Sequence, residues 1–157
     1  MKKGIIAGAS FGLASASITT LGLMIGLYAS TDSKLAVVAG ILTIAIADAF
    51  SDALGVHVSK ESEADCLQSE VWRATISTFI FKFVFANLFL VPVIFLPLKA
   101  AVIVSIGWGI LIISLLSYFM AKGRKESVIG VIGEHLAITF VVLIATQYVG
   151  QLIAKFF

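Results

Sequence analysis

The sequence has little of what most soluble domains use to build a core or a reactive site. It contains one cysteine, two prolines, two histidines and only 13% charged residues in 157 positions. A single cysteine, Cys66, excludes an internal disulfide, and no CxxC pair or histidine and cysteine cluster suggests a zinc or redox site. The longest polar connection, 59–71, is too short to fold around a core of its own. The sequence therefore excludes a soluble domain of any size.

Apolar residues make up 60% of the chain, and the mean hydropathy is +1.10. This balance is typical of a protein whose solvent is lipid. A helix needs about 20 apolar residues to cross the roughly 30 Å hydrocarbon core of a bilayer. Five runs meet that length: 5–30, 35–57, 72–98, 100–121 and 128–157. We predict an all-α integral membrane protein with one domain, 1–157, of five transmembrane helices.

The basic residues predict how these helices are oriented. One side of the predicted topology carries Lys2, Lys3, Lys60, Arg73, Lys122, Arg124 and Lys125, and the other carries Lys34, Lys99 and Lys155. Because cytoplasmic loops carry the excess of Lys and Arg, we expect a cytoplasmic N-terminus and a C-terminus outside. The apolar run after the first lysines is longer than that of a secretory signal, so we expect a retained helix in a multi-pass membrane protein, in the cell membrane if the host is prokaryotic. The sequence has no basic stripe with interleaved aromatic residues, so we do not expect nucleic-acid binding.

Two aspartates, Asp48 and Asp52, interrupt the second apolar run. An ionised carboxylate at the centre of a bilayer costs roughly 2.5 to 3.5 kcal/mol, so the pair needs a partner or a purpose. Residues four apart share a helical face, where two charges about 6 Å apart repel by about 3 kcal/mol at an effective dielectric constant of 20. Such a pair can hold either protons or a divalent cation. Carboxylate oxygens suit Mn²⁺, and with imidazole they also suit Fe²⁺.

Other ionisable groups lie at comparable depths if each helix rises 1.5 Å per residue. Asp48 and Lys82 both lie about 14 Å from the cytoplasmic end of their helices, while Asp52, Glu134 and His135 form a shallower level. Two interpretations stay open. Asp48 can form a buried ion pair with Lys82, which leaves Asp52 with Glu134 or His135 as the ion site, or the aspartates together can face a hydrated path.

Three further side chains are candidates near the predicted cytoplasmic surface. His57 ends the second run, where it is either a proton partner or an interfacial residue in water. Glu63 and Glu70 share one face if the link is helical, and acidic groups there would concentrate divalent cations at an entrance. The alternative is an ordinary solvated charge run.

Small residues repeat every four positions in the first helix, at Gly4, Gly8 and Gly12. Such a stripe lets another helix approach closely. It predicts either packing within the chain or the seam of a homodimer.

Two stretches resemble the vacuolar iron transporter family, the plant and yeast vacuolar exporters of iron and manganese. Residues 12–23 read GLASASITTLGL where the family reads G-x-x-D-G-x-x-T-T-x-G-L, and residues 49–59 read AFSDALGVHVS where it reads A-x-S-M-A-x-G-E-Y-x-S. This chain departs from the family at its most important positions, with Ser15 for an aspartate, Asp52 for a methionine and Val56 for a glutamate. The 59–71 link also leaves no room for the metal-collecting domain of the better-known members.

The resemblance implies a homodimer of five-helix subunits with an ion path between the first two helices of both protomers. It implies proton-coupled export of Fe²⁺ or Mn²⁺ as substrate, with no permanently bound cofactor. In this interpretation Asp48 and Asp52 carry the metal, Glu134 assists, and Ser15 and Thr19 line the path. A membrane subunit with purely structural ion pairs and a transporter of another ion are the alternatives. An enzyme is not expected, because no nucleophile, base and orienting group occur at a supportive spacing.

Overall fold

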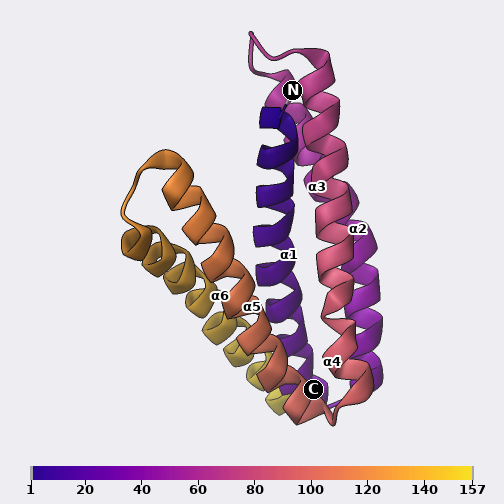
Figure 1. Ribbon diagram of the computed structural model, residues 1–157. Coiled ribbons are helices and arrows are strands. Elements are labelled where there is room, and N and C mark those ends of the chain that lie inside the picture. Colours follow the sequence, from indigo (N-terminus) through magenta and orange to yellow (C-terminus); the bar gives the residue numbers. More distant parts are fainter. Residues whose placement is uncertain (1, 157) are drawn as a thin grey trace.

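The computed structural model describes residues 2–156 and is helical nearly throughout (Figure 1). The helices are α1 (Lys2–Thr31), α2 (Lys34–Glu61), α3 (Gln68–Leu88), α4 (Leu90–Phe95), α5 (Leu98–Arg124) and α6 (Val128–Phe156). Among the described residues, five helical stretches are long and apolar enough to cross a membrane, with α3 and α4 together forming the third. The prediction of five apolar spans in an all-α protein is confirmed.

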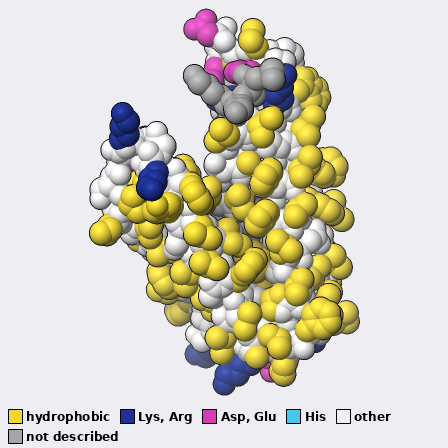
Figure 2. All heavy atoms as spheres, viewed as in Figure 1, with side chains coloured by type: hydrophobic (Ala, Val, Ile, Leu, Met, Phe, Trp, Pro, Cys, Tyr) yellow, Lys and Arg dark blue, Asp and Glu magenta, His cyan; other side chains and the backbone are white. Residues whose placement is uncertain are grey.

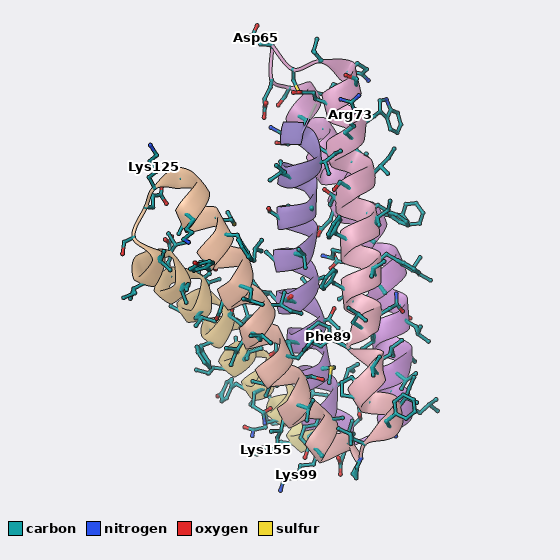
Figure 3. The ribbon with its side chains drawn as sticks, viewed as in Figure 1. Asp65, Arg73, Phe89, Lys99, Lys125 and Lys155 are labelled. Atoms are coloured by element: carbon teal, nitrogen blue, oxygen red, sulfur yellow. The ribbon has the colours of Figure 1, made fainter. Side chains whose placement is uncertain are left out.

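Helix α1 lies at the centre and contacts α2, α3, α5 and α6. Figure 1 shows α2, α3 and α4 on one side of α1 and the antiparallel pair α5–α6 on the other, leaning away from α1 toward the N-terminal end. The α2–α3 link and the α5–α6 turn lie at that end, where Figure 3 labels Asp65, Arg73 and Lys125. Lys99 and Lys155 lie at the opposite end, near the C-terminus. The outer surface seen in Figure 2 is mostly hydrophobic, as contact with lipid requires.

The third span differs from the prediction because it begins at Gln68 and is divided at Phe89. Pro92 disfavours an unbroken helix here, since it has no N–H for the carbonyl of the residue four positions earlier and its ring crowds that carbonyl. In α4 the proline instead occupies the first turn, where an N–H has no partner within the helix. The Lys34 ammonium, at the start of α2, donates to the carbonyls of Ile94 (3.0 Å) and Leu96 (3.2 Å) and so satisfies the end of α4.

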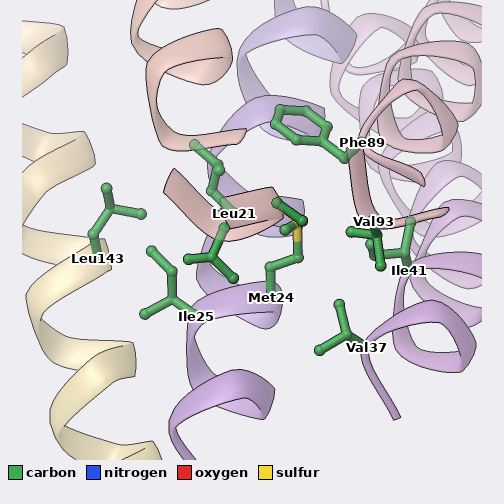
Figure 4. Packing of buried hydrophobic residues seen from close by; sticks show 10 residues of the cluster. Leu21, Met24, Ile25, Val37, Ile41, Phe89, Val93 and Leu143 are labelled. Atoms are coloured by element: carbon green, nitrogen blue, oxygen red, sulfur yellow. The ribbon is translucent and has the colours of Figure 1, made fainter. Parts of the chain in front are cut away.

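The apolar core is concentrated in the half of the molecule near the C-terminal end. Figure 4 shows side chains from α1, α2, α4 and α6 meeting there, together with Phe89 at the break between α3 and α4. The labelled members are Leu21, Met24, Ile25, Val37, Ile41, Phe89, Val93 and Leu143. The other half is packed differently, by glycines and by a charged cluster.

The glycine stripe of α1 is covered by α3 of the same chain. A Cβ atom on Gly4 would lie 2.7 Å from the Glu70 carbonyl oxygen, and one on Gly12 would lie 2.7 Å from that of Thr78. A Cβ atom on Gly8 would collide with the backbone of Ala74. Of the two interpretations of the stripe, the structure therefore shows packing within the chain, against α3.

Candidate functional site

The charged cluster joins α1, α2 and α3 at the end of the molecule where the glycines pack. Lys82 extends from α3, and its Nζ lies 2.5 Å from Oδ2 of Asp48 and 2.5 Å from Oδ2 of Asp52. Nζ also donates to Oγ of Ser15 on α1 at 2.5 Å, and that hydroxyl donates to Oδ2 of Asp52 at 2.6 Å. One ammonium is therefore shared by two carboxylates and a serine.

Small residues bring the three helices close enough for these contacts. The buried stripe of α2 includes Ala45, Ala49 and Ala53, each next to an aspartate on the helix surface. On α1, a Cβ atom at Gly12 would lie 3.1 Å from the backbone nitrogen of Lys82, so only glycine lets α1 approach α3 this closely. The cluster thus depends on side chains with little volume beside the charged ones.

The charges differ sharply in their exposure. The Lys82 side chain is 1% exposed, whereas those of Asp48 and Asp52 are 25% and 18% exposed. The ammonium is sealed between helices, and the carboxylates lie at the edge of the cluster on α2. Burying charges in this way costs free energy that is repaid only when the partners and their hydrogen bonds stay in place.

The two carboxylates are not held equally. Oδ2 of Asp52 accepts hydrogen bonds from both Lys82 and Ser15. Oδ2 of Asp48 is buried and forms an ion pair with the same ammonium, but it accepts no hydrogen bond from Ser15. Asp48 therefore has fewer polar partners in the cluster than Asp52.

The alternative ion site, Asp52 with Glu134 or His135, is not formed. Asp52 lies beside Lys82 and away from α6. Glu134 is exposed on α6, which α1 separates from α2 (Figure 1). His135 instead contacts Oγ of Ser117 at 2.7 Å. Since that hydroxyl already donates to the Ile113 carbonyl, Nδ1 of His135 is the donor in this contact. The sequence predicted a similar depth for Asp52 and for Glu134 and His135. It did not predict that Asp52 and these two residues lie on opposite sides of α1.

The remaining candidates lie apart from the cluster. His57 contacts Oγ1 of Thr75 through Nδ1 at 3.0 Å and meets the Trp72 ring edge-on. Glu63 in the α2–α3 link pairs with Lys60 in the last turn of α2 at 2.6 Å. Thr19 donates back to the carbonyl of Ser15 at 2.8 Å, and Glu70 occupies the first turn of α3. Within residues 2–156, no three His, Cys, Asp or Glu side chains are grouped so that they could hold a metal ion.

Ser15 makes contacts that the sequence did not predict. The resemblance placed it on a path for ions, whereas the structure places its hydroxyl between an ammonium and a carboxylate. Its position four residues before Thr19 was visible in the sequence, but its contact with Lys82 was not. The contact requires α1 and α3 to lie close together at Gly12. The glycine stripe predicts that another helix approaches α1 closely, but it does not identify that helix as α3.

Comparisons of the chain with protein-family models, with curated proteins and with solved structures find no match. The resemblance to the vacuolar iron transporter family therefore rests on the two motifs quoted above alone, and the functional argument rests on the site itself.

Proposed function

We propose that the protein is a membrane transporter that exchanges a cation for protons at the cluster of Asp48, Asp52 and Lys82. The observation that carries this proposal is the ratio of the charges, because two carboxylates share one ammonium. One ammonium balances the charge of only one ionised carboxylate. The second carboxylate, in an apolar span, requires a proton or another cation. The cluster therefore has one exchangeable positive charge.

Asp48 is the acceptor of that charge in this proposal. Its Oδ2 is paired with the Lys82 ammonium but, unlike that of Asp52, accepts no hydrogen bond from Ser15, and a quarter of its side chain is exposed. A cation would approach from the α2 side, where the carboxylates are, while Lys82 closes the opposite side. To bind both carboxylates, the cation must weaken their contacts with the ammonium, which can stay bonded to Ser15. Lys82 would compete with the cation for the two carboxylates, so that the cation does not bind too tightly to be released.

For the transported cation we propose Mn²⁺ or Fe²⁺, moved out of the cytoplasm. Carboxylate oxygens suit divalent ions of this type, and the resemblance of the α1 and α2 motifs favours the same substrates. Two aspartates are fewer ligands than such an ion takes, so water or a second copy of the chain in a homodimer would supply the others. We place the N-terminal end in the cytoplasm, because that end carries the larger number of Lys and Arg residues.

Transport in proteoliposomes tests the proposal. The purified protein is reconstituted with a metal-sensitive dye inside, a pH gradient is imposed, and uptake of Mn²⁺ is followed together with the internal pH. We expect metal and proton fluxes of opposite direction. Asp48→Asn should reduce both fluxes to the level of empty vesicles, because the amide cannot exchange a proton for a metal ion.

The matched control is Asp65→Asn, the same chemical change at an exposed position in the α2–α3 link. It should leave both fluxes unchanged. Equal fluxes in wild type and Asp48→Asn, with both proteins monodisperse, would show that Asp48 is not the exchange site. If wild type has no cation flux under gradients of either direction, the proposal of transport is wrong.

A second function is favoured by the sealing of Lys82, which is 1% exposed and joins three helices. In this alternative the cluster only fastens α1, α2 and α3, and the protein is a non-transporting membrane subunit. Wild-type vesicles would then show no cation flux, while neutralising the three charged residues together would leave a folded protein.

A further inference from the structure

A cleft separates α1 from the α5–α6 pair at the N-terminal end of the molecule. Its volume is about 720 Å³. Its walls are almost entirely apolar, and they include Phe11, Ile18, Ile113, Leu116, Met120 and Ile138. In Figure 2 the hollow between the leaning arm and the body of the molecule is bordered by hydrophobic side chains. The proposed exchange cluster involves α2 and α3 and makes no use of this cleft.

The mouth of the cleft is basic. Arg124, which ends α5, belongs to the lining, and Lys122 and Lys125 are its neighbours in the chain. Figure 3 places Lys125 at the tip of the α5–α6 arm. From Arg124 to Ile113, the deepest lining residue of α5, the helix rises about 16 Å. This depth matches one leaflet of a roughly 30 Å hydrocarbon core, with the charged residues at the level of the headgroups.

The size and the lining of the cleft indicate what can occupy it. A volume of 720 Å³ lies in the range of pockets for small molecules, about 300–1,000 Å³. A molecule that fits must be apolar along the cleft and negatively charged at its mouth.

We propose that this cleft binds one anionic phospholipid, with an acyl chain between α1 and the α5–α6 pair and the phosphate at Arg124. Nε of Arg124 already pairs with Glu126 at 3.0 Å, and the side chain is 67% exposed. That pair uses one of the five N–H groups of the guanidinium, so the others can hold a phosphate in a bidentate contact. The lipid would fill a space that otherwise separates the arm from the rest of the protein.

Native mass spectrometry of the full chain tests this binding. The protein is reconstituted in nanodiscs of equal parts phosphatidylglycerol and phosphatidylcholine, released by collisional activation, and the lipids that stay bound are identified and counted. Wild type should retain phosphatidylglycerol in preference to phosphatidylcholine. Arg124→Gln should weaken phosphatidylglycerol binding about tenfold and leave phosphatidylcholine binding unchanged, because the charged contact is lost. The control Lys99→Gln, at the opposite end, should behave as wild type.

The apolar part of the cleft is tested by filling it. Ala14→Trp places a large ring between the walls, and Ala7→Trp does so nearer the exposed mouth, in case the deeper change prevents folding. Either variant should lose both lipids, whereas Ala47→Trp on the outer face of α2 should lose neither. Unchanged lipid retention in the folded cleft-filling variants would overturn the proposal. A change in the number of subunits without a change in lipid retention would make the cleft an interface between copies of the chain, and would also overturn it.

Discussion

Removing the ammonium of Lys82 should destabilise the protein more than any other single change of charge. The substitution Lys82→Met keeps the length of the side chain and leaves two carboxylates without their partner. Both oxygens lie 2.5 Å from the same nitrogen, so they are at most about 5 Å apart. At an effective dielectric constant of 20, two charges at that separation repel by roughly 3 kcal/mol. Breaking a buried pair in this way typically costs about 3 to 5 kcal/mol. We expect the free energy of unfolding to fall by about 3 kcal/mol or more.

The assay is reversible unfolding in mixed micelles, with Lys99→Met as the control at an exposed lysine. The control should stay within about 0.5 kcal/mol of wild type. Adding Asp48→Asn and Asp52→Asn to Lys82→Met should recover most of the loss, because a neutral cluster no longer contains unpaired charge. If Lys82→Met alone costs less than about 0.5 kcal/mol, or if the effects of the three changes simply add, the ammonium does not hold the two carboxylates as described.

Two further predictions concern the contacts of α1. Gly8→Val should lower the free energy of unfolding by about 2 to 3 kcal/mol, because the new side chain meets the α3 backbone. Gly55→Val, with open space around it, should cost less than about 1 kcal/mol. Equal losses for the two variants would contradict the packing of the stripe against α3. Ser15→Ala should cost about 1 to 3 kcal/mol, because a hydrogen bond to a charged group is lost, and Ser51→Ala on the exposed surface should be neutral. Denaturant titration measures both pairs, and a neutral Ser15→Ala would remove the serine from the cluster.

The sequence was sufficient for the spans and for one contact of the site. Helical rise is fixed, so counting residues from the ends of the spans placed Asp48 and Lys82 at one depth, and the structure pairs them. The same counting failed for Asp52 with Glu134 and His135. Depth along the membrane normal says nothing about the side of the bundle that a helix occupies, and α1 lies between these groups.

The break after α3 and the partner of the glycine stripe show two other limits. Pro92 in the sequence disfavours an unbroken helix, but the sequence did not show that the division falls at Phe89. The stripe of α1 predicted a close helix contact, but small residues are equally suited to a partner in the same chain or in another. Only the arrangement of the helices showed that α3 takes this position.

The contact of Lys34 with the end of α4 affects the electrical balance of the two faces of the molecule. Carbonyl groups at a helix end carry partial negative charge, and here two of them, from Ile94 and Leu96, surround the ammonium. Part of this lysine's field is therefore cancelled locally before it reaches the lipid headgroups. A count of basic residues therefore overstates the positive charge that Lys34 presents at this face.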